Sequence, residues 1–232
     1  EAPGVGDLSR RIGPPFLNGE SAYFMNVNRN KRGITLDLRK PEGREVLYRL
    51  VTISDVVLDA FRPAVLPRLG LDYESLKRAN AAIIACSISG FGQTGPYRDY
   101  KADDLILINM GGLTYATPGI PDATETGPQK PPLRPATPIA DFTSGITGAV
   151  ATLFALFSRE MDGLGRHVDL SQQAATASML TWDISTYSYL GVLPGRSSSL
   201  GSGPMPNVYV PCKDGYVAIV AFSDYHWPKL VH

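Results

Sequence analysis

One carboxylate, Asp141, lies in a segment where an ionised side chain is costly to bury. Ile139 and Ala140 precede it, Phe142 follows it, and residues 146–157 are mostly apolar. An unpartnered charge in such surroundings is strongly destabilising, so we expect a specific reason for this aspartate. Asp141 either caps the N-terminus of the following helix, or it is a nucleophile that the helix dipole keeps ionised for attack on an activated acyl group. Its position alone does not decide between the two.

Two further segments are candidates for ligand binding. Arg29, Lys31 and Arg32 lie within four residues, and they belong either to a solvated loop or, with neighbouring asparagines and backbone N–H groups, to a phosphate site. The Gly-rich segment SGFGQTGP at 89–96 follows an apolar strand pattern, as ligand-binding turns at the carboxyl edge of an open α/β sheet do. It is neither a Walker loop nor a complete GxGxxG fingerprint, so by itself the signal is weak.

Composition and motifs exclude several classes of protein. The sequence has no HExxH, CxxC or GxSxG, so we expect no metal site and no nucleophile-elbow hydrolase. Its two cysteines, Cys86 and Cys212, are far apart and indicate a reducing compartment: the cytoplasm, or the mitochondrial matrix or a peroxisome in a eukaryote. Basic and acidic residues both number 22, so no overall field attracts nucleic acid. The apolar stretch 143–158 falls short of a membrane span and is predicted to be a core helix.

Short apolar strands alternate with helices along the chain. Strands fully apolar along their length are typical of a mostly parallel sheet covered by helices on both faces. We therefore predict an α/β fold, an open Rossmann-like sheet flanked by helices, with the start of a smaller second domain. The predicted strands are 33–38, 55–61, 81–89 and 165–171, and the predicted helices are 40–54, 73–80, 103–110, the segment after Asp141, and 172–190.

The composition changes after residue 190. Residues 1–190 form the predicted large domain, and 191–206, rich in Gly, Ser and Pro, form a linker or a glycine-containing active-site loop. Residues 207–232 are the predicted start of the small domain, with two strands joined by a Lys-Asp-Gly turn. The chain begins without methionine and stops where a helical pattern starts, so we expect a fragment of a longer protein.

Seven segments, in this order, resemble the class III CoA-transferases, the family that includes formyl-CoA transferase and carnitine CoA-transferase, with α-methylacyl-CoA racemase as a relative. The strand and helix with which that family usually starts are absent before the first segment. The segments are PGVGDLSR (3–10), SAYFMNVNRNKRGITLDL (21–38), DVVLDAFRPAVLPRLGLDYESL (55–76), IIACSISGFGQTGPY (83–97), KADDLI (101–106), ADFTSG (140–145) and GRHVDLS (165–171).

Asp141 of ADFTSG occupies the position of the family's nucleophilic aspartate. The resemblance implies that its carboxylate attacks an acyl-CoA thioester, and that a mixed anhydride and then an aspartyl-CoA thioester form. The implied function is a CoA-transferase that moves CoA from an acyl-CoA donor to a carboxylic acid acceptor. These activated intermediates survive only where water is excluded. A coenzyme A thioester is then a substrate, and no tightly bound cofactor is implied.

The resemblance also implies binding roles for other positions. Tyr23 and Asp103 are implied to line the acyl pocket, and Gly201 and Gly203 to belong to a loop that closes over it. Ala60 stands where formyl-CoA transferase has an asparagine, so that polar contact is not available here. The implied CoA-binding residues, whose cations suit the phosphates of CoA, are Arg29, Lys31, Arg32, Leu36, Phe61, Arg68 and Lys101.

Two alternatives stay open. The racemase pairs its aspartate with the histidine of a GHD motif, whereas this chain has ADD, with Asp103 at the histidine position; because aspartate is a poor proton shuttle near neutral pH, the transferase is favoured. In the second alternative the chain is a non-catalytic CoA- or nucleotide-binding module in which Asp141 only caps a helix. Apart from both, the 232-residue piece is inert if its core and partner surfaces are incomplete, with apolar patches left exposed. The resemblance further implies an interlocked homodimer acting on acyl-CoA and a small carboxylic acid, without a nucleic acid or membrane partner.

Overall fold

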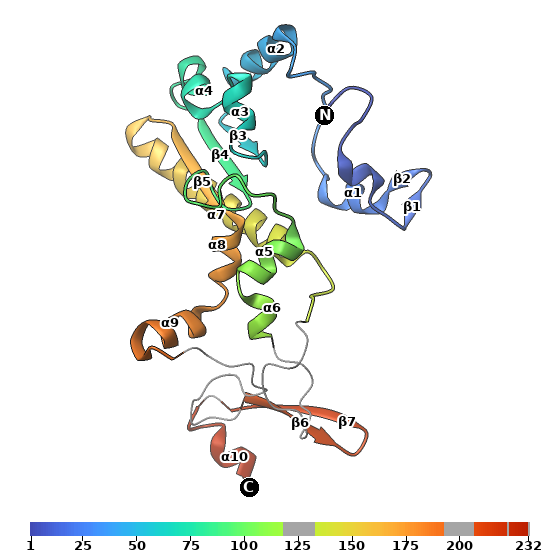
Figure 1. Ribbon diagram of the computed structural model, residues 1–232, viewed down its shortest axis with the longest axis vertical. Helices are drawn as coiled ribbons and strands as arrows, with labels where there is room; N and C mark the ends of the chain where they lie inside the picture. The colour runs from blue at the N-terminus through green and yellow to red at the C-terminus, as the bar shows by residue number, and fades with distance from the viewer. Residues whose placement is uncertain (118–132, 193–206, 222, 232) are drawn as a thin grey trace. The chain divides into compact units, whose positions relative to one another are not determined.

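The computed structural model describes residues 1–117, 133–192, 207–221 and 223–231 (Figure 1). The chain forms two compact units. The first comprises Glu1–Asp59, Ala64–Cys86 and Phe154–Val168, and the second comprises Ala60–Pro63, Ser87–Leu153 and Asp169–His232. The domain limits expected after residues 190 and 206 stay predictions.

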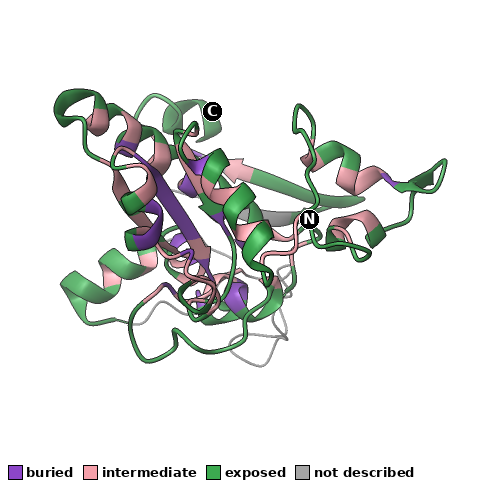
Figure 2. Cartoon of the chain, turned by 90° about the horizontal axis from the view of Figure 1, so that it is seen from above, coloured by how far each residue is buried: buried purple, intermediate pink, exposed green. Residues whose placement is uncertain are grey.

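The main sheet has three parallel strands, with β4 (Ile84–Ser89) between β3 (Val56–Asp59) and β5 (Arg166–Ser171). β4 is buried at five of its six residues, and it is largely purple in Figure 2. Such a strand must be apolar along its length because both of its faces are covered, which is what the apolar run at 81–89 predicted. The predicted α/β fold, a parallel sheet flanked by helices, is confirmed.

The core of the first unit joins helices α2 (Pro41–Val51) and α4 (Tyr73–Ala79) to the start of β4. Asn80 links these elements, because its side-chain amide donates hydrogen bonds of 3.0 Å to the carbonyls of both Val51 and Ser54. The buried residues of this core are Val51, Leu76, Ile83 and Ala85. The unit also contains η1 (Leu8–Arg11), β1 (Phe16–Leu17), β2 (Glu20–Ser21), α1 (Ala22–Val27) and α3 (Val65–Leu69).

The core of the second unit joins α5 (Asp104–Met110) to the first turn of the long helix α7 (Ile139–Asp162), whose last residues belong to the first unit. Its buried residues are Leu107, Ile108 and Ala140, with Phe91 and Ile139 packed against them. β6 (Asn207–Cys212) and β7 (Gly215–Val220) form the antiparallel hairpin predicted at 207–222. The remaining elements are α6 (Leu113–Ala116), α8 (Gln172–Ala177), α9 (Thr181–Leu190) and α10 (Trp227–Val231).

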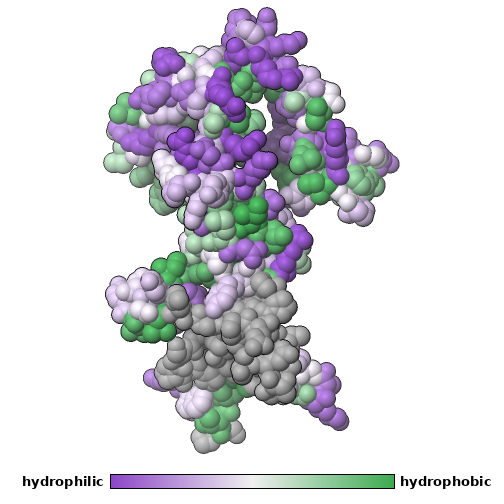
Figure 3. Space-filling model, in the orientation of Figure 1, coloured by the Kyte–Doolittle hydropathy of each residue, from purple (hydrophilic) through white to green (hydrophobic). Residues whose placement is uncertain are grey.

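Helix α7 has one face of small residues and one of large apolar residues. The small residues Ala140, Ser144, Gly148 and Ala155 are buried, and Gly148 lies so close to β4 that a Cβ on it would be 2.8 Å from Cδ1 of Ile88. The large residues lie on the surface, with exposed fractions of 45–78%: Phe142, Ile146, Val150, Leu153, Phe154, Phe157 and Met161. Apolar side chains also reach the surface elsewhere, as Figure 3 shows. The prediction of a buried core helix is therefore wrong for the described residues, because only the face of small residues is buried.

By length and composition alone α7 could cross a membrane, with 22% of its most apolar window buried. This is weak evidence, because the core helix of a soluble protein passes the same test. A second explanation for an exposed apolar face is contact with another protein surface.

Two predicted elements differ in the structure. Residues 33–38 alternate apolar and polar side chains but form no strand; Ile34 is 48% exposed, and within the described residues no neighbouring strand pairs with this segment. The predicted helix 172–190 is broken into α8 and α9. At the break the Ser178 hydroxyl donates to the carbonyl of Ala175, a local contact that competes with helix propagation.

A substitution at Gly165, just before β5, tests the close packing of this residue against the backbone before β4. A Cβ added there would lie 2.2 Å from the carbonyl oxygen of Ile83, and backbone atoms cannot move aside as a flexible side chain can. We expect Gly165→Ala to lower the free energy of unfolding by about 2 kcal/mol or more, measured by urea denaturation of the full-length protein. Gly33→Ala is the control, since a Cβ added at Gly33 would have no neighbouring atom within 4 Å. Equal stability of the two variants would contradict this packing.

Candidate active site

Asp141 is the third residue of α7, because the helix begins at Ile139. The first helical hydrogen bond runs from the Phe142 N–H to the carbonyl of Pro138, at 3.2 Å. The interpretation of Asp141 as the N-cap is therefore wrong: the residue lies inside the first turn, not before it. A negative charge in the first turn still interacts favourably with the helix dipole.

The cap of α7 comes from another helix. Oδ1 of Asp104, the partly buried first residue of α5, accepts hydrogen bonds from the N–H groups of Ala140 (2.8 Å) and Asp141 (3.4 Å). The first N–H groups of a helix have no partner within the helix, so they need an outside acceptor. The carboxylate of Asp104 thereby fixes the backbone of the turn that carries Asp141.

A second contact holds the Asp141 side chain itself. Nε2 of Gln172 donates a hydrogen bond of 3.1 Å to Oδ1 of Asp141. Gln172 is the first residue of α8 and directly follows β5, and the Ser171 hydroxyl caps α8 by accepting from the Ala174 N–H. The carboxyl end of a sheet strand thus presents an amide donor to the candidate nucleophile, where open α/β sheets place their ligands.

The pKa of Asp141 is raised above the usual value of a carboxyl group. The largest cause is burial of the carboxyl group among protein atoms; the hydrogen bond from Gln172 opposes it, and the negative charges of Asp104 and Asp103 add to it. Asp141 nevertheless keeps exposed surface in the described structure. The described residues therefore perturb this carboxyl group but do not by themselves exclude water from it.

Asp103, implied to line the acyl pocket, caps α5. Its Oδ1 accepts a hydrogen bond of 3.1 Å from the N–H of Ile106. Asp103 lies near enough to raise the pKa of Asp141, so the structure brings these two predicted residues together. Its role in substrate binding stays a prediction.

The Gly-rich segment 89–96 is held at the end of β4 by the neighbouring strand. Both carboxylate oxygens of Asp169 in β5 accept from the Gln93 N–H, at 3.0 and 3.1 Å. Gly92 has φ +85°, in the left-handed region that favours glycine. Phe91 is also within ring-contact distance of Tyr97 and Tyr100. The conformation of this turn in the second unit is therefore fixed by hydrogen bonds and ring contacts. Lys101, which follows it in the chain, is exposed.

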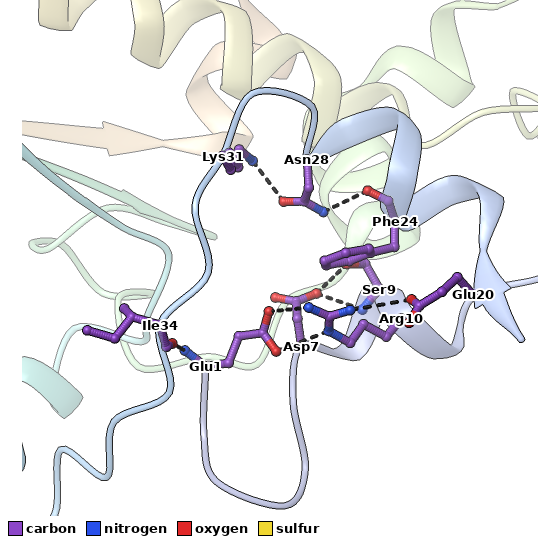
Figure 4. A network of polar contacts seen from close by, with 9 residues as sticks. All are labelled: Glu1, Asp7, Ser9, Arg10, Glu20, Phe24, Asn28, Lys31 and Ile34. Carbon is purple, nitrogen blue, oxygen red and sulfur yellow. Dashed lines mark hydrogen bonds and ion pairs between the residues drawn. The ribbon is translucent and has the colours of Figure 1, made fainter.

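The predicted CoA-binding cations at 29–32 belong to the first unit and follow α1 in the chain. Figure 4 shows a polar network beside them in which the Arg10 guanidinium pairs with Glu1 at 2.8 Å and lies 3.9 Å from the ring of Phe24. Nζ of Lys31 donates to the Asn28 side chain at 2.9 Å and to the Val27 carbonyl. Lys31 therefore shapes its own loop in this structure, while Arg29 and Arg32 are exposed.

The other predicted positions are divided between the units. In the first unit, Tyr23 of α1 and Leu36 are partly buried, and Nε of Arg68 donates to the Ala64 carbonyl at 2.8 Å. In the second unit, Phe61 is 46% exposed. Gly201 and Gly203 lie outside the described residues. Within the described ranges, no three His, Cys, Asp or Glu side chains form a cluster that could hold a metal.

Sequence reasoning missed Asp104 and Gln172. Asp104 lies in the KADDLI segment beside Asp103, and only Asp103 stands at a position that distinguishes the transferases from the racemase. Gln172 stands at the junction of a predicted strand and a predicted helix, which is where a parallel sheet delivers polar side chains. That junction was the available signal for Gln172.

The sequence profile of CoA-transferase family III matches residues 1–232, which is the entire chain. The chain belongs to this family. Among CoA-transferase family III proteins, it is 35% identical over 236 residues to succinate–glutarate CoA-transferase of Agrobacterium fabrum, covering 99% of this chain and 57% of that protein. It is 38% identical over 197 residues to acetyl-CoA:oxalate CoA-transferase of Acetobacter aceti, covering 84% of this chain and 48% of that protein.

The fold of a solved family member agrees with this assignment. A CaiB/BaiF family protein from Brucella suis matches with a TM-score of 0.81 and 36% sequence identity, over 99% of this chain and 60% of that one. This CoA-transferase family III chain thus spans about half to three-fifths of the length of the relatives it matches.

The raised pKa of Asp141 predicts a stability cost at neutral pH. Because the folded protein binds this proton more readily than the unfolded chain, the group's contribution to the free energy of unfolding falls as pH rises from the ordinary carboxyl pKa to the raised one, and stays low above it. Asp141→Asn keeps the oxygen that accepts from Gln172 and removes the charge. We expect this variant to have a higher Tm than the wild type at neutral pH, and no advantage at a pH below the ordinary carboxyl pKa.

Thermal denaturation of both proteins across that pH range checks this expectation. Asp214→Asn, in the exposed turn between β6 and β7, is the matched control. A Tm difference for Asp141→Asn that does not change with pH would contradict the raised pKa.

Proposed function

We propose that the protein containing this chain is an acyl-CoA:carboxylate CoA-transferase whose nucleophile is Asp141. The observation that carries the proposal is the arrangement of this carboxyl group: it lies in the first turn of a helix, and Oδ1 accepts a hydrogen bond from Gln172, so that Oδ2 is the oxygen proposed to attack. Membership of CoA-transferase family III supports the reaction class, and relatives named for transfer between short carboxylic acids support small acids as substrates.

The reaction follows from an attack by Oδ2 of Asp141 on the thioester carbonyl. The C–S bond breaks, CoA leaves as a thiolate, and a mixed anhydride remains on the aspartate. The thiolate then attacks the aspartyl carbonyl, which releases the donor acid and leaves an aspartyl-CoA thioester. The acceptor carboxylate displaces CoA to form a second anhydride, and the returning thiolate takes the acceptor acyl group and regenerates Asp141. Only the ionised carboxylate attacks, so the raised pKa places the acid limit of activity nearer to neutral pH.

Water must be kept from these intermediates, and the described residues leave Asp141 exposed. The proposed cover has three parts: the bound acyl-CoA, the loop containing Gly201 and Gly203, and a second copy of the chain in a homodimer. Lys101 and Phe61 are the proposed CoA contacts on the second unit. The CoA-binding roles of the cations on the first unit stay predictions of the resemblance. Asp103, on the same unit as Asp141, is the proposed contact of the acyl group, and the role of Tyr23 stays a prediction of the resemblance.

The racemase alternative is disfavoured by the contacts of Asp103. A racemase needs a second acid–base group that exchanges a proton with the α-carbon. The carboxylate of Asp103 instead accepts a backbone N–H at the start of α5. This carboxylate is thus already used as the N-cap of α5, a structural role that needs no proton exchange with a substrate.

Trapping of the covalent intermediate tests the nucleophile. The full-length protein is incubated with succinyl-CoA, glutaryl-CoA or acetyl-CoA together with hydroxylamine, and mass spectrometry locates the aspartyl hydroxamate. We expect the modification at Asp141. We also expect Asp141→Ala to lower CoA exchange by at least about 10³-fold, while the exposed control Asp214→Ala exchanges normally. Exchange at the wild-type rate in Asp141→Ala would overturn the proposal.

The proposed homodimer uses the large apolar face of α7. Phe154 is at the middle of that face and is 71% exposed, and burial of such a side chain against a second copy contributes about 2 kcal/mol. We expect Phe154→Glu to shift the protein toward monomer in sedimentation velocity. Ile53→Glu, at a residue 81% exposed and outside α7, is the control. A dimer unaffected by Phe154→Glu would place the interface elsewhere.

A further inference from the structure

The neighbours of Asp141 have opposite effects on the ionisation of its carboxyl group. Gln172 in α8 donates to Oδ1 and favours the ionised carboxylate, whereas Asp103 and Asp104, at the start of α5, place negative charge nearby and favour the protonated form. The two carboxylates are already used as acceptors for backbone N–H groups. Among these three side chains, only the amide of Gln172 supplies a proton donor to the carboxylate of Asp141.

The geometry also distinguishes the two oxygens of Asp141. Oδ1 of Asp104 accepts hydrogen bonds from the backbone N–H groups of Ala140 and Asp141, and these bonds hold the backbone of the turn in place. The Cα atom of Asp141 is therefore fixed. The hydrogen bond from Gln172 then fixes Oδ1 at 3.1 Å from Nε2. With one oxygen fixed, the rotation of the carboxylate about its Cβ–Cγ bond is restricted, and Oδ2 is presented in one direction.

We propose that Gln172 is a positioning residue for the transfer reaction, which holds Oδ1 of Asp141 so that Oδ2 is presented to the thioester. This inference rests on the proposed function of Asp141 as nucleophile. Gln172 touches neither substrate nor CoA in this proposal and acts only through Asp141. Its amide is suited to the task because it donates to the carboxylate without adding a charge that would neutralise the nucleophile.

The neighbouring residue offers a matched control. Gln173, the second residue of α8, also donates one side-chain hydrogen bond, from Nε2 to the carbonyl of Met110 at 3.1 Å. Gln172 and Gln173 are both partly buried. Substitution of either by methionine keeps the length of the side chain and removes one hydrogen bond, but only Gln172→Met changes a contact of Asp141.

The test measures the rate of hydroxamate formation at Asp141 in full-length wild-type, Gln172→Met and Gln173→Met proteins, with succinyl-CoA and hydroxylamine, as a function of pH. Because misplacement of a reacting group is costly, we expect Gln172→Met to lower the rate about tenfold to a hundredfold. Its acid limit moves to higher pH, since loss of the donor leaves burial and the two neighbouring carboxylates unopposed. Gln173→Met should keep the wild-type rate and profile.

Two further variants test the direction of the effect. Gln172→Glu keeps the length of the side chain but places a carboxylate next to Oδ1. It should therefore move the acid limit of the reaction to a higher pH than Gln172→Met does. Asp104→Asn keeps an acceptor oxygen for the α7 N–H groups and removes a negative charge, so it should move the acid limit to lower pH. A residue with a merely structural role would change the rate without these opposite shifts.

The outcomes separate the two proposals. Absence of a hydroxamate at Asp141 in the wild type overturns the proposed function, and the inference on Gln172 falls with it. If the wild type is modified at Asp141 while Gln172→Met and Gln173→Met share its rate and acid limit, the role of Gln172 is overturned and the proposed function stands. The rate is expressed per folded protein, determined by circular dichroism, so that a loss of folding in one variant is not counted as a loss of positioning.

Discussion

The candidate site depends on the hydrogen bonding of one carboxylate, that of Asp141, at the start of α7. A helix N-terminus offers N–H groups and a favourable dipole, but the N–H groups of this first turn are bonded to Asp104, not to Asp141. Asp141 therefore receives its one described hydrogen bond from a side chain on a different helix. The site is thus built from three helix starts, those of α5, α7 and α8. The packing of Leu107, Ile108 and Ala140 holds two of them together.

The same arrangement explains why ionisation of this aspartate costs free energy. Burial and two nearby carboxylates oppose its ionisation, while a single amide favours it. A residue optimised for stability would not be placed in this way, and the conflict is typical of a functional position. The exposed apolar face of α7 also indicates a functional surface, because a contiguous group of large apolar side chains is usually covered by another protein or by a ligand.

Much of this could be predicted from the sequence. The apolar runs at 55–61 and 81–89 predicted two of the three strands, because a strand covered on both faces must be apolar along its length. The third strand was predicted at 165–171, where Val168 and Leu170 alternate with polar residues. Residues 33–38 have an equally good pattern but no partner strand in the described structure, and local pattern does not contain that information. The start of α7 was misjudged because its cap comes from a residue 36 positions away in the chain. Gln172 was missed for the same reason: its contact to Asp141 spans 31 positions, and only the fold brings the two residues together.

The end of β5 joins several contacts within a few residues. The side chain of Asp169 holds the N–H of Gln93, Ser171 caps α8, and Gln172 reaches Asp141. Side chains alternate along a strand, so the loss or gain of one residue in β5 would turn Asp169 and Ser171 to the other face of the sheet and would shift the start of α8, which carries Gln172. Natural variation in length should therefore accumulate in the surface segments between elements, while the distance in sequence from Asp169 to Gln172 stays constant among functional relatives.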